Sequence, residues 1–260
     1  MSEFAKRVAT GILLLSVIVF VPYFLGNLGT VALVFFLSVE GLREFYSIFN
    51  NPKLLSISSF SFAMTGLFYI LISFFPIWGI RIFLTLLSIG LLLIFLFDKE
   101  VTGEIISKLA MGFLYVPFLF SHLINKNNPE AFWLVFSIAF ATDTFAFLGG
   151  KLLGKHKLIP SISPKKTVEG AVCGIFGAVF FAAFFYYFIH RHLPDLAFAA
   201  MILMASAASQ LGDLAASRWK RSCAVKDFGK LLPGHGGVLD RFDSVLFVAP
   251  IVHYYYIFFV

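Results

Sequence analysis

The residues best suited to chemistry lie in one stretch near the C-terminus, between Ser217 and Asp243. This stretch combines basic side chains that can bind phosphate oxygens, glycines whose backbone N–H groups can approach an anion, and carboxylates of the kind that bind Mg²⁺. The basic residues are Lys220, Arg221, Lys226 and Arg241, the glycines are Gly234, Gly236 and Gly237, and the acids are Asp227, Asp240 and Asp243. The combination predicts a site that handles phosphate groups with the help of a divalent cation.

Structural alternatives remain open for parts of this stretch. A solvated loop would explain the charges, but not their concentration around a Pro-Gly-His-Gly-Gly turn. His235 is equally compatible with a structural turn histidine, given the donors and acceptors of its ring. Asp240 and Asp243 could pair with Arg241 and Lys230 in an ion network that orders the loop, although exposed ion pairs contribute little to stability.

The composition places this stretch in a membrane protein. Of 260 residues, 60% are hydrophobic, 18% are aromatic and 13% are charged, whereas an ordinary soluble domain has about 25% charged residues. There is too little polar surface for a water-soluble globule and too much apolar surface for a disordered chain. These proportions exclude a cytosolic enzyme, a nucleic-acid-binding module and a solvated scaffold.

Nine apolar windows are long enough to cross a hydrocarbon core, which takes about 20 residues of helix. They cover approximately residues 8–26, 28–42, 56–76, 80–97, 105–124, 131–149, 168–189, 195–214 and 244–260. The second window is interrupted by Glu40, Arg43 and Glu44. The first resembles a signal peptide after Lys6 and Arg7, but the spans that follow favour an uncleaved helix. We therefore expect an all-α polytopic integral membrane protein with about nine transmembrane helices.

The positive charges predict the orientation of these helices. When the N-terminus is placed in the cytoplasm, 17 of the 20 Lys and Arg residues fall in cytoplasmic segments. Only Arg81, Lys126 and Arg191 fall outside. Because cytoplasmic loops carry an excess of Lys and Arg, this distribution predicts a cytoplasmic N-terminus and a C-terminus outside. The formal net charge of +6 is explained by the same bias before any anionic ligand is invoked.

Polar residues divide the chain into two regions. Residues 1–130 are almost entirely hydrophobic helix, and residues 131–260 form the predicted catalytic region, with cytoplasmic loops at 150–167 and 215–243. The two cysteines, Cys173 and Cys223, fall in different environments and predict neither a disulfide framework nor a metal site.

Four carboxylates lie at unusual depths: Glu40, Asp143, Glu169 and Asp213. A charged side chain within a membrane span costs several kcal/mol, about 2.5–3.5 on insertion scales, and usually faces a protein interior or a wet cavity. The alternative is that each carboxylate marks a helix end at the membrane surface. That alternative is preferred for Glu40, whereas the small neighbours of Asp143 and Asp213 favour a functional role.

The 150–167 loop adds lysines and glycines. Gly149-Gly150-Lys151 and Gly154 precede Lys155, His156 and Lys157, and Lys165-Lys166-Thr167 follow. Such residues can approach phosphate oxygens. Cytoplasmic topology alone also predicts the lysines, and Gly150 with Gly154 is equally typical of helix packing. We interpret Gly170, Gly174 and Gly177 mainly as packing residues.

The motifs resemble those of the phosphatidate cytidylyltransferases, also called CDP-diacylglycerol synthases. The resemblance is carried by Ser217, Lys220-Arg221, Lys226-Asp227, Pro233-x-His235-Gly236-Gly237 and Asp240-Arg241-x-Asp243. Secondary motifs of that family are similar to Asp143-Thr144, Lys165-Lys166-Thr167-x-Glu169-Gly170 and Gln210-x-Gly212-Asp213. Trp219 departs from the aliphatic residue or Phe usual in the family, which bears on local packing. Over residues 1–130 the likeness extends only to a run of hydrophobic helices.

The resemblance implies a reaction of CTP with phosphatidate that gives CDP-diacylglycerol and pyrophosphate. It also implies dependence on Mg²⁺, with room for a second cation, and an active site facing the cytoplasm in a multi-pass protein of the cell inner membrane. CTP, phosphatidate and membrane lipids are the implied partners, nucleic acid is not, and a homodimer is suggested by the family and by the small-residue helix faces. The residues by themselves indicate only phosphate chemistry at the inner bilayer surface.

The resemblance assigns roles by position. The expected catalytic residues are Asp213, Lys226, Asp227, His235, Asp240 and Arg241. The expected substrate-binding residues are Asp143, Lys165, Lys166, Thr167, Glu169, Ser217, Lys220, Arg221, Gly236 and Gly237. The expected Mg²⁺ ligands are Asp213 and Asp240, assisted by Asp243 or Asp227.

Three other functions are alternatives for this sequence. A CDP-alcohol phosphotransferase would need an Asp-Gly-x-x-Ala-Arg motif, which this sequence lacks. A transporter or flippase for an anionic lipid or solute could use Asp143 and Asp213 as ion-coupling groups, but its polar site would lie near mid-membrane. A purely structural subunit would leave the Ser217 to Asp243 pattern unexplained.

Overall fold

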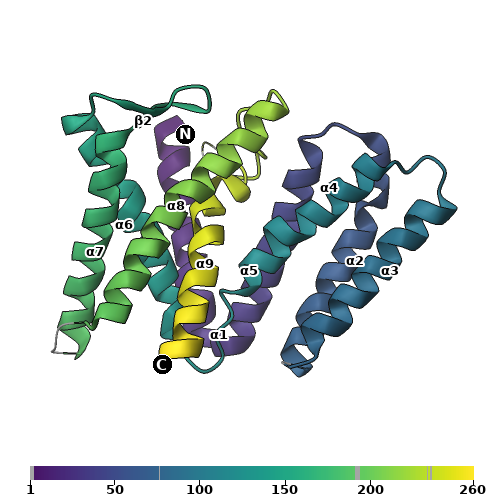
Figure 1. The fold of residues 1–260 in the computed structure, drawn as a ribbon, viewed down its shortest axis with the longest axis horizontal. Coiled ribbons are helices and arrows are strands. Elements are labelled where there is room, and N and C mark those ends of the chain that lie inside the picture. Colours follow the sequence, from purple (N-terminus) through teal and green to yellow (C-terminus); the bar gives the residue numbers. More distant parts are fainter. Residues whose placement is uncertain (1–2, 76, 191–193, 233, 235) are drawn as a thin grey trace. The chain divides into compact units, whose positions relative to one another are not determined.

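The computed structural model describes residues 3–75, 77–190, 194–232, 234 and 236–260, and most of them are helical (Figure 1). Seven helical segments of the described chain are long and apolar enough to cross a membrane, and α7 is apolar over Val168–Phe184. The predicted all-α polytopic membrane fold is thus confirmed. The elements are α1 (Glu3–Ser47), α2 (Pro52–Phe74), α3 (Gly79–Phe97), α4 (Gly103–Phe113), the π-helix η1 (Leu114–Phe118), α5 (Leu119–Ser121), α6 (Glu130–Leu153), β1 (Lys157–Ile159), β2 (Ser163–Thr167), α7 (Val168–His190), α8 (Leu196–Ser222) and α9 (Leu239–Phe259).

Helix α1 covers both of the first two predicted spans. Its 45 residues would extend about 68 Å at 1.5 Å per residue, more than twice the roughly 30 Å hydrocarbon core. The helix is broken at Gly26, where φ is 56°, a left-handed value that glycine adopts without steric cost. This break lies at the predicted boundary between residues 8–26 and 28–42. The total of nine spans and the orientation of the termini stay predictions.

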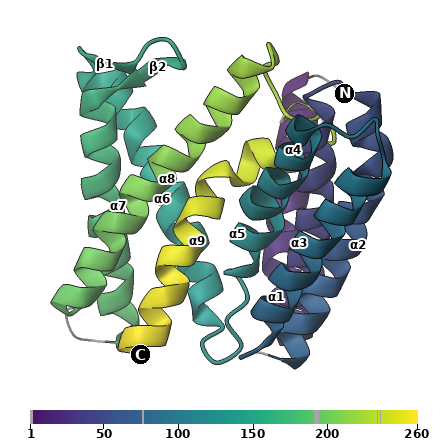
Figure 2. The same ribbon diagram turned by 45° about the vertical axis from the view of Figure 1, so that its right-hand side comes forward.

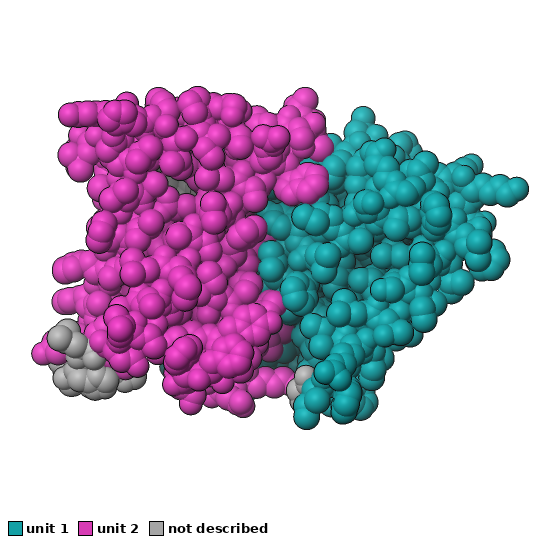
Figure 3. Space-filling view, viewed as in Figure 1, with its two compact units in different colours: residues 1–121, 227–240 teal, residues 122–226, 241–260 magenta. Residues whose placement is uncertain are grey.

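The chain forms two compact units (Figure 3). Unit 1 comprises residues 1–121 and 227–240, and unit 2 comprises residues 122–226 and 241–260. Residues 227–240, which the sequence analysis placed in the C-terminal catalytic region, therefore group with the N-terminal helices. The loop between α8 and α9 is also shorter than residues 215–243, because α8 continues to Ser222 and α9 begins at Leu239.

Unit 1 is built on buried aromatic packing between α1, α2, α3 and α4. The rings of Phe68, Phe83 and Phe113 lie 4.6–5.2 Å apart between centroids. The hydroxyl of Tyr46 lies 3.0 Å from both the Ser61 hydroxyl and the Leu109 carbonyl oxygen. These contacts fix the second half of α1 against α2 and α4, and with it the side chains near Tyr46.

Unit 2 depends on a close approach of α6 and α7. A Cβ atom at Gly149 or Gly177 would overlap the side chain of Cys173 or Phe145, respectively. A Cβ atom at Gly174 would lie 2.9 Å from the backbone oxygen of Thr142. Small residues let helix backbones approach in this way, so the packing interpretation of the α7 glycines is confirmed. Helices α8 and α9 lie beside the α6–α7 pair in the same unit (Figure 2).

The loop at 150–167 contains an element that the sequence analysis did not predict. Strands β1 and β2 form an antiparallel pair in which Lys157 lies opposite Thr167 and Ile159 opposite Ser163. Alternating apolar residues are the usual signal for a strand, and β2 reads Ser-Pro-Lys-Lys-Thr instead. The hairpin is therefore held by its contacts with α7 rather than by an apolar face of its own.

Candidate active site

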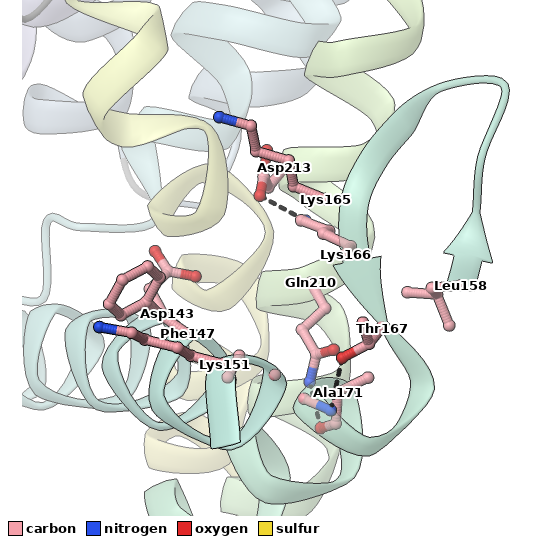
Figure 4. A pocket seen from close by; sticks show the side chains of 13 residues that line it. Asp143, Phe147, Lys151, Leu158, Lys165, Lys166, Thr167, Ala171, Gln210 and Asp213 are labelled. Carbon is pink, nitrogen blue, oxygen red and sulfur yellow. Dashed lines mark hydrogen bonds and ion pairs between the residues drawn. The ribbon is translucent and has the colours of Figure 1, made fainter. Parts of the chain in front are cut away.

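A cavity of about 340 Å³ lies within unit 2, between α6, α7, α8 and the hairpin (Figure 4). Residues from motifs far apart in the sequence line it together. Its apolar wall includes Phe147 and Leu158. Its charged and polar lining residues are Asp143, Lys151, Lys165, Lys166, Thr167, Gln210 and Asp213. The structure thus brings five of the predicted site residues to one cavity: Asp143, Lys165, Lys166, Thr167 and Asp213.

Lys166 and Asp213 form an ion pair at this cavity (Figure 4). Lys166 comes from β2 and Asp213 from the middle of α8, whose next turn places the Ser217 hydroxyl 3.4 Å from the Asp213 carboxylate. The two charged side chains remain 28% and 30% exposed. Exposed pairs contribute only about 0–1 kcal/mol to stability. Lys166 can therefore exchange Asp213 for a bound phosphate, and Asp213 can exchange Lys166 for a bound cation, at little cost in stability.

Two further carboxylates meet beside Ser244 on α9. Asp143 of α6 accepts a hydrogen bond from the Ser244 hydroxyl at 3.3 Å. Asp243 is buried, with 8% of its surface exposed, and accepts from the Ser244 backbone N–H at 2.8 Å. Asp243 also interacts electrostatically with Asp213 and with Lys220. Unit 2 thus concentrates three carboxylates from three helices together with nearby lysines.

This donor set fits Mg²⁺ in one particular way. Mg²⁺ is usually held by one or two carboxylates, with waters and substrate phosphates completing its coordination. Asp143 of α6 and Asp213 of α8 both line the cavity, together with lysines that suit phosphates. Among the described residues, no three His, Cys, Asp or Glu side chains stand close enough to enclose a metal ion. The two carboxylates therefore fit a divalent cation whose remaining ligands are waters and phosphate oxygens.

Glu169 and Thr167, which were expected to bind substrate, hold the hairpin in place. The Glu169 carboxylate accepts from the backbone N–H groups of Lys155 and His156 at 3.0 and 3.2 Å, and it lies 2.6 Å from Nδ1 of His156. Thr167 accepts from the Gly170 N–H at 3.1 Å with its hydroxyl oxygen. These bonds tie both ends of the hairpin to the first turn of α7. They position Lys165 and Lys166 at the cavity.

The end of α8 carries the other expected phosphate-binding residues. Lys220 and Arg221 lie in its last turn, and Arg221 donates to the Val225 carbonyl oxygen at 3.4 Å. Lys226 and Asp227 follow in the loop and are exposed. Arg241, in the first turn of α9, is also exposed.

In unit 1, Asp240 closes residues 227–240, which we call the signature loop. One of its carboxylate oxygens accepts from the backbone N–H groups of Phe228 and Gly237, at 2.8 and 2.9 Å. Gly236 has a φ of 86° and accepts from the Leu232 N–H at 2.9 Å. His235, expected to be catalytic, lies outside the described residues. Asp213 belongs to unit 2 and Asp240 to unit 1, and their pairing as metal ligands stays a prediction.

Glu44 is a residue whose position the sequence analysis missed. Its carboxylate accepts from the backbone N–H groups of Val238 and Leu239, both at 2.9 Å, and only 3% of its surface is exposed. The signal in the sequence was a second carboxylate next to the apolar window at residues 28–42. Only its neighbour Glu40 was considered as a carboxylate at an unusual depth. Glu40 pairs with Arg43 at 2.9 Å on the same helix, which continues to Ser47. Its interpretation as a residue at a helix end stays a prediction.

Comparison with known proteins decides which family these features belong to. The model of the cytidylyltransferase family matches residues 5–259. The chain belongs to this family. A phosphatidate cytidylyltransferase of Bacillus subtilis (strain 168) is 33% identical over 265 residues, which cover 98% of each chain. The resemblance proposed from the motifs is confirmed, and it extends through the N-terminal helices.

Staphylococcal relatives match this chain over a shorter region. Phosphatidate cytidylyltransferases of Staphylococcus aureus (strain COL) and Staphylococcus epidermidis (strain ATCC 12228) are 39% and 37% identical over 145 residues. Each match covers 56% of this chain and 56% of the relative. The chain therefore spans just over half the length of these staphylococcal relatives.

Proposed function

We propose that this cytidylyltransferase transfers the cytidylyl group of CTP to phosphatidate, which yields CDP-diacylglycerol and pyrophosphate. The observation that carries the proposal is the cavity of unit 2, where Lys166 pairs with Asp213 beside Lys165, Lys151 and Asp143. Its lysines suit phosphate groups and its carboxylates suit a divalent cation. The names of the relatives support CTP and phosphatidate as the substrates.

The chemistry needs no nucleophile from the protein. A phosphate monoester has a second pKa near 6, so the phosphate of phosphatidate is largely deprotonated at neutral pH. One of its oxygens attacks the α-phosphorus of CTP, a new P–O bond forms, and the bond to the β-phosphate oxygen breaks as pyrophosphate leaves. The residues of the cavity orient the two phosphates in line and neutralise their charge, which is the main contribution a protein makes to such a transfer.

Individual residues then take distinct parts. Lys151, Lys165 and Lys166 bind phosphate oxygens, and Asp213 holds Lys166 at the cavity until substrate replaces it. Asp143 and Asp213 would hold Mg²⁺, with Asp243 and the predicted Asp240 as further candidates and room for a second cation. When bound, the ion would neutralise the charge that develops on the phosphates.

The setting of the site is part of the proposal. We place it at the cytoplasmic face of the cell inner membrane, in a multi-pass chain with its N-terminus inside and its C-terminus outside. The positive-inside distribution of 17 of the 20 Lys and Arg residues supports this orientation. Membrane lipids surround the protein, a homodimer is the proposed assembly, and nucleic acid is not a partner.

An assay with labelled CTP tests the function. Protein purified in detergent is incubated with phosphatidate, Mg²⁺ and CTP carrying its label in the α-phosphate. We expect the label to move into a chloroform-soluble lipid, whereas label in the γ-phosphate should appear in pyrophosphate. EDTA should stop the transfer, and excess Mg²⁺ should restore it. Failure to form any labelled lipid would exclude the proposed activity. Transport of phosphatidate across vesicles without CTP consumption would support the transporter alternative instead.

A further inference from the structure

We propose that Glu44 is a positioning residue of the enzyme, which fixes the signature loop so that Asp240 and Arg241 occupy defined places at the start of α9. The proposal rests on the function proposed above, because these two residues belong to the motif expected to carry the chemistry.

Both oxygens of the Glu44 carboxylate are used as acceptors. One accepts from the Val238 N–H and the other from the Leu239 N–H, each at 2.9 Å. The first N–H groups of a helix have no partner within it and need an outside acceptor. Val238, which immediately precedes α9, has no side-chain oxygen that could cap the helix. Glu44 of α1, which precedes Val238 by 194 residues in the sequence, accepts these hydrogen bonds instead.

Two glycines of the signature loop lie directly against the same carboxylate. A Cβ atom at Gly229 or at Gly237 would overlap the side chain of Glu44. Neither glycine has a positive φ, unlike Gly234 and Gly236. The need for glycine at 229 and 237 is therefore a need for space beside Glu44, not for an unusual backbone conformation. Both ends of the loop contact one buried acid.

Asp240 completes the attachment from the other side. Its carboxylate accepts from the Phe228 and Gly237 N–H groups, so it joins the beginning of the loop to the start of α9. Glu44 in turn is held by α1, where Tyr46 is fixed by Ser61 and the Leu109 carbonyl. The backbone around Asp240 is thus anchored to the packed helices of unit 1. In this structure the Gly237, Val238 and Leu239 amides serve that anchoring.

Kinetics of purified variants provide the first test. Gln keeps the size of Glu but offers one acceptor oxygen and one NH₂ donor, so Glu44→Gln must place a donor against a backbone N–H. Because a displacement of about 1 Å can cost a hundredfold in rate, we expect kcat to fall about tenfold to a hundredfold in Glu44→Gln and Glu44→Ala. The KM for CTP should change little, because the cavity lysines belong to unit 2. Glu40→Gln, one turn away on α1, is the matched control and should keep its activity.

Hydrogen exchange provides a test that needs no substrate. In the wild-type protein we expect slow exchange at the Val238 and Leu239 amides, and faster exchange there in Glu44→Gln. Peptides from α2 and α6 should exchange as in the wild type. Faster exchange throughout the protein would show that Glu44 serves the fold in general and would overturn the proposal. Unchanged exchange at 238 and 239 would overturn it as well, whether or not the proposed reaction is correct.

A double-mutant cycle tests the contact itself. We expect Gly237→Ala to lower kcat strongly in the wild-type background, because the new methyl group would overlap Glu44. In a Glu44→Ala background that space is open, so the same substitution should cost much less, as expected for residues in contact. Gly66→Ala, at a position with no atom within 4 Å of the added Cβ, is the control. Equal losses from Gly237→Ala in both backgrounds would contradict a positioning contact.

Discussion

Lys166 on β2 and Asp213 on α8 form an ion pair at a cavity that lies among membrane-spanning helices. Neither charge is buried deeply enough for the pair to be a major source of stability. Each of them instead faces a space large enough for substrate phosphates. The pair therefore joins β2 to α8 within unit 2 and also lies at the site proposed for the transfer reaction.

Removing either partner of this pair should affect activity far more than stability. We expect Asp213→Asn to abolish turnover, because it removes a charge proposed to hold Mg²⁺, and Lys166→Ala to raise the KM for CTP. The thermal unfolding temperature of both variants in detergent should change by only a few degrees. The matched control is Lys53→Ala in unit 1, which breaks ion pairs of Lys53 with Asp98 and Glu100, both at 2.8 Å. Normal Mg²⁺-dependent turnover in Asp213→Asn would contradict this assignment.

The role of Glu169 can be separated from direct substrate binding by changing its partner. If Glu169 acts by holding the hairpin, His156→Ala should raise the KM for CTP a few-fold in the same direction as Glu169→Gln, because both loosen the support of Lys165 and Lys166. If Glu169 binds substrate itself, His156→Ala should leave the KM unchanged. We expect the first result, measured with purified variants. Lys108→Ala, which breaks an ion pair with Glu104 on α4, is the control.

The close packing of α6 and α7 predicts the effect of small enlargements. Gly177→Ala and Gly149→Ala would place a methyl group into Phe145 and Cys173, and overpacking of this kind typically costs about 1–3 kcal/mol. We expect both variants to unfold at lower temperature in detergent. At Gly103 an added Cβ meets no atom within 4 Å, so Gly103→Ala should be neutral or slightly stabilising. Equal stability of all three variants would contradict close packing as the reason for glycine.

The sequence was sufficient to predict features that depend on local pattern. The apolar windows correspond to helices, and the boundary between the first two lies at Gly26, where the backbone of α1 breaks. Asp143, Lys166 and Asp213 were identified by their charge in apolar or glycine-rich surroundings, and the structure places all three at one cavity. The helix predictions succeeded because the apolar length of a segment limits where it can lie relative to a membrane. The roles of the three charged residues in the reaction stay predictions.

Features that depend on distant contacts could not be predicted in this way. Glu44 and Glu40 look alike in sequence, and only tertiary packing decides that Glu44 contacts Val238 and Leu239 while Glu40 pairs with Arg43. The hairpin was missed because its strands lack alternating apolar residues. The contact of Glu169 with His156 follows from that hairpin, so it was missed for the same reason.

Substitutions at Asp240 distinguish its two roles, as a loop-closing residue and as a predicted Mg²⁺ ligand. One oxygen of Asp240 accepts both the Phe228 and the Gly237 N–H, and Asn keeps one such oxygen while it loses the charge. Asp240→Asn should therefore preserve the loop, which slow hydrogen exchange at Phe228 would verify, whereas Asp240→Ala should disrupt it. We expect both variants to lose Mg²⁺-dependent turnover, because the charge is needed as well as the hydrogen bonds. If Asp240→Asn keeps near-normal activity and only Asp240→Ala is inactive, Asp240 closes the loop without binding the metal. Asp143, Asp213 and Asp243 in unit 2 would then be left as the candidate ligands.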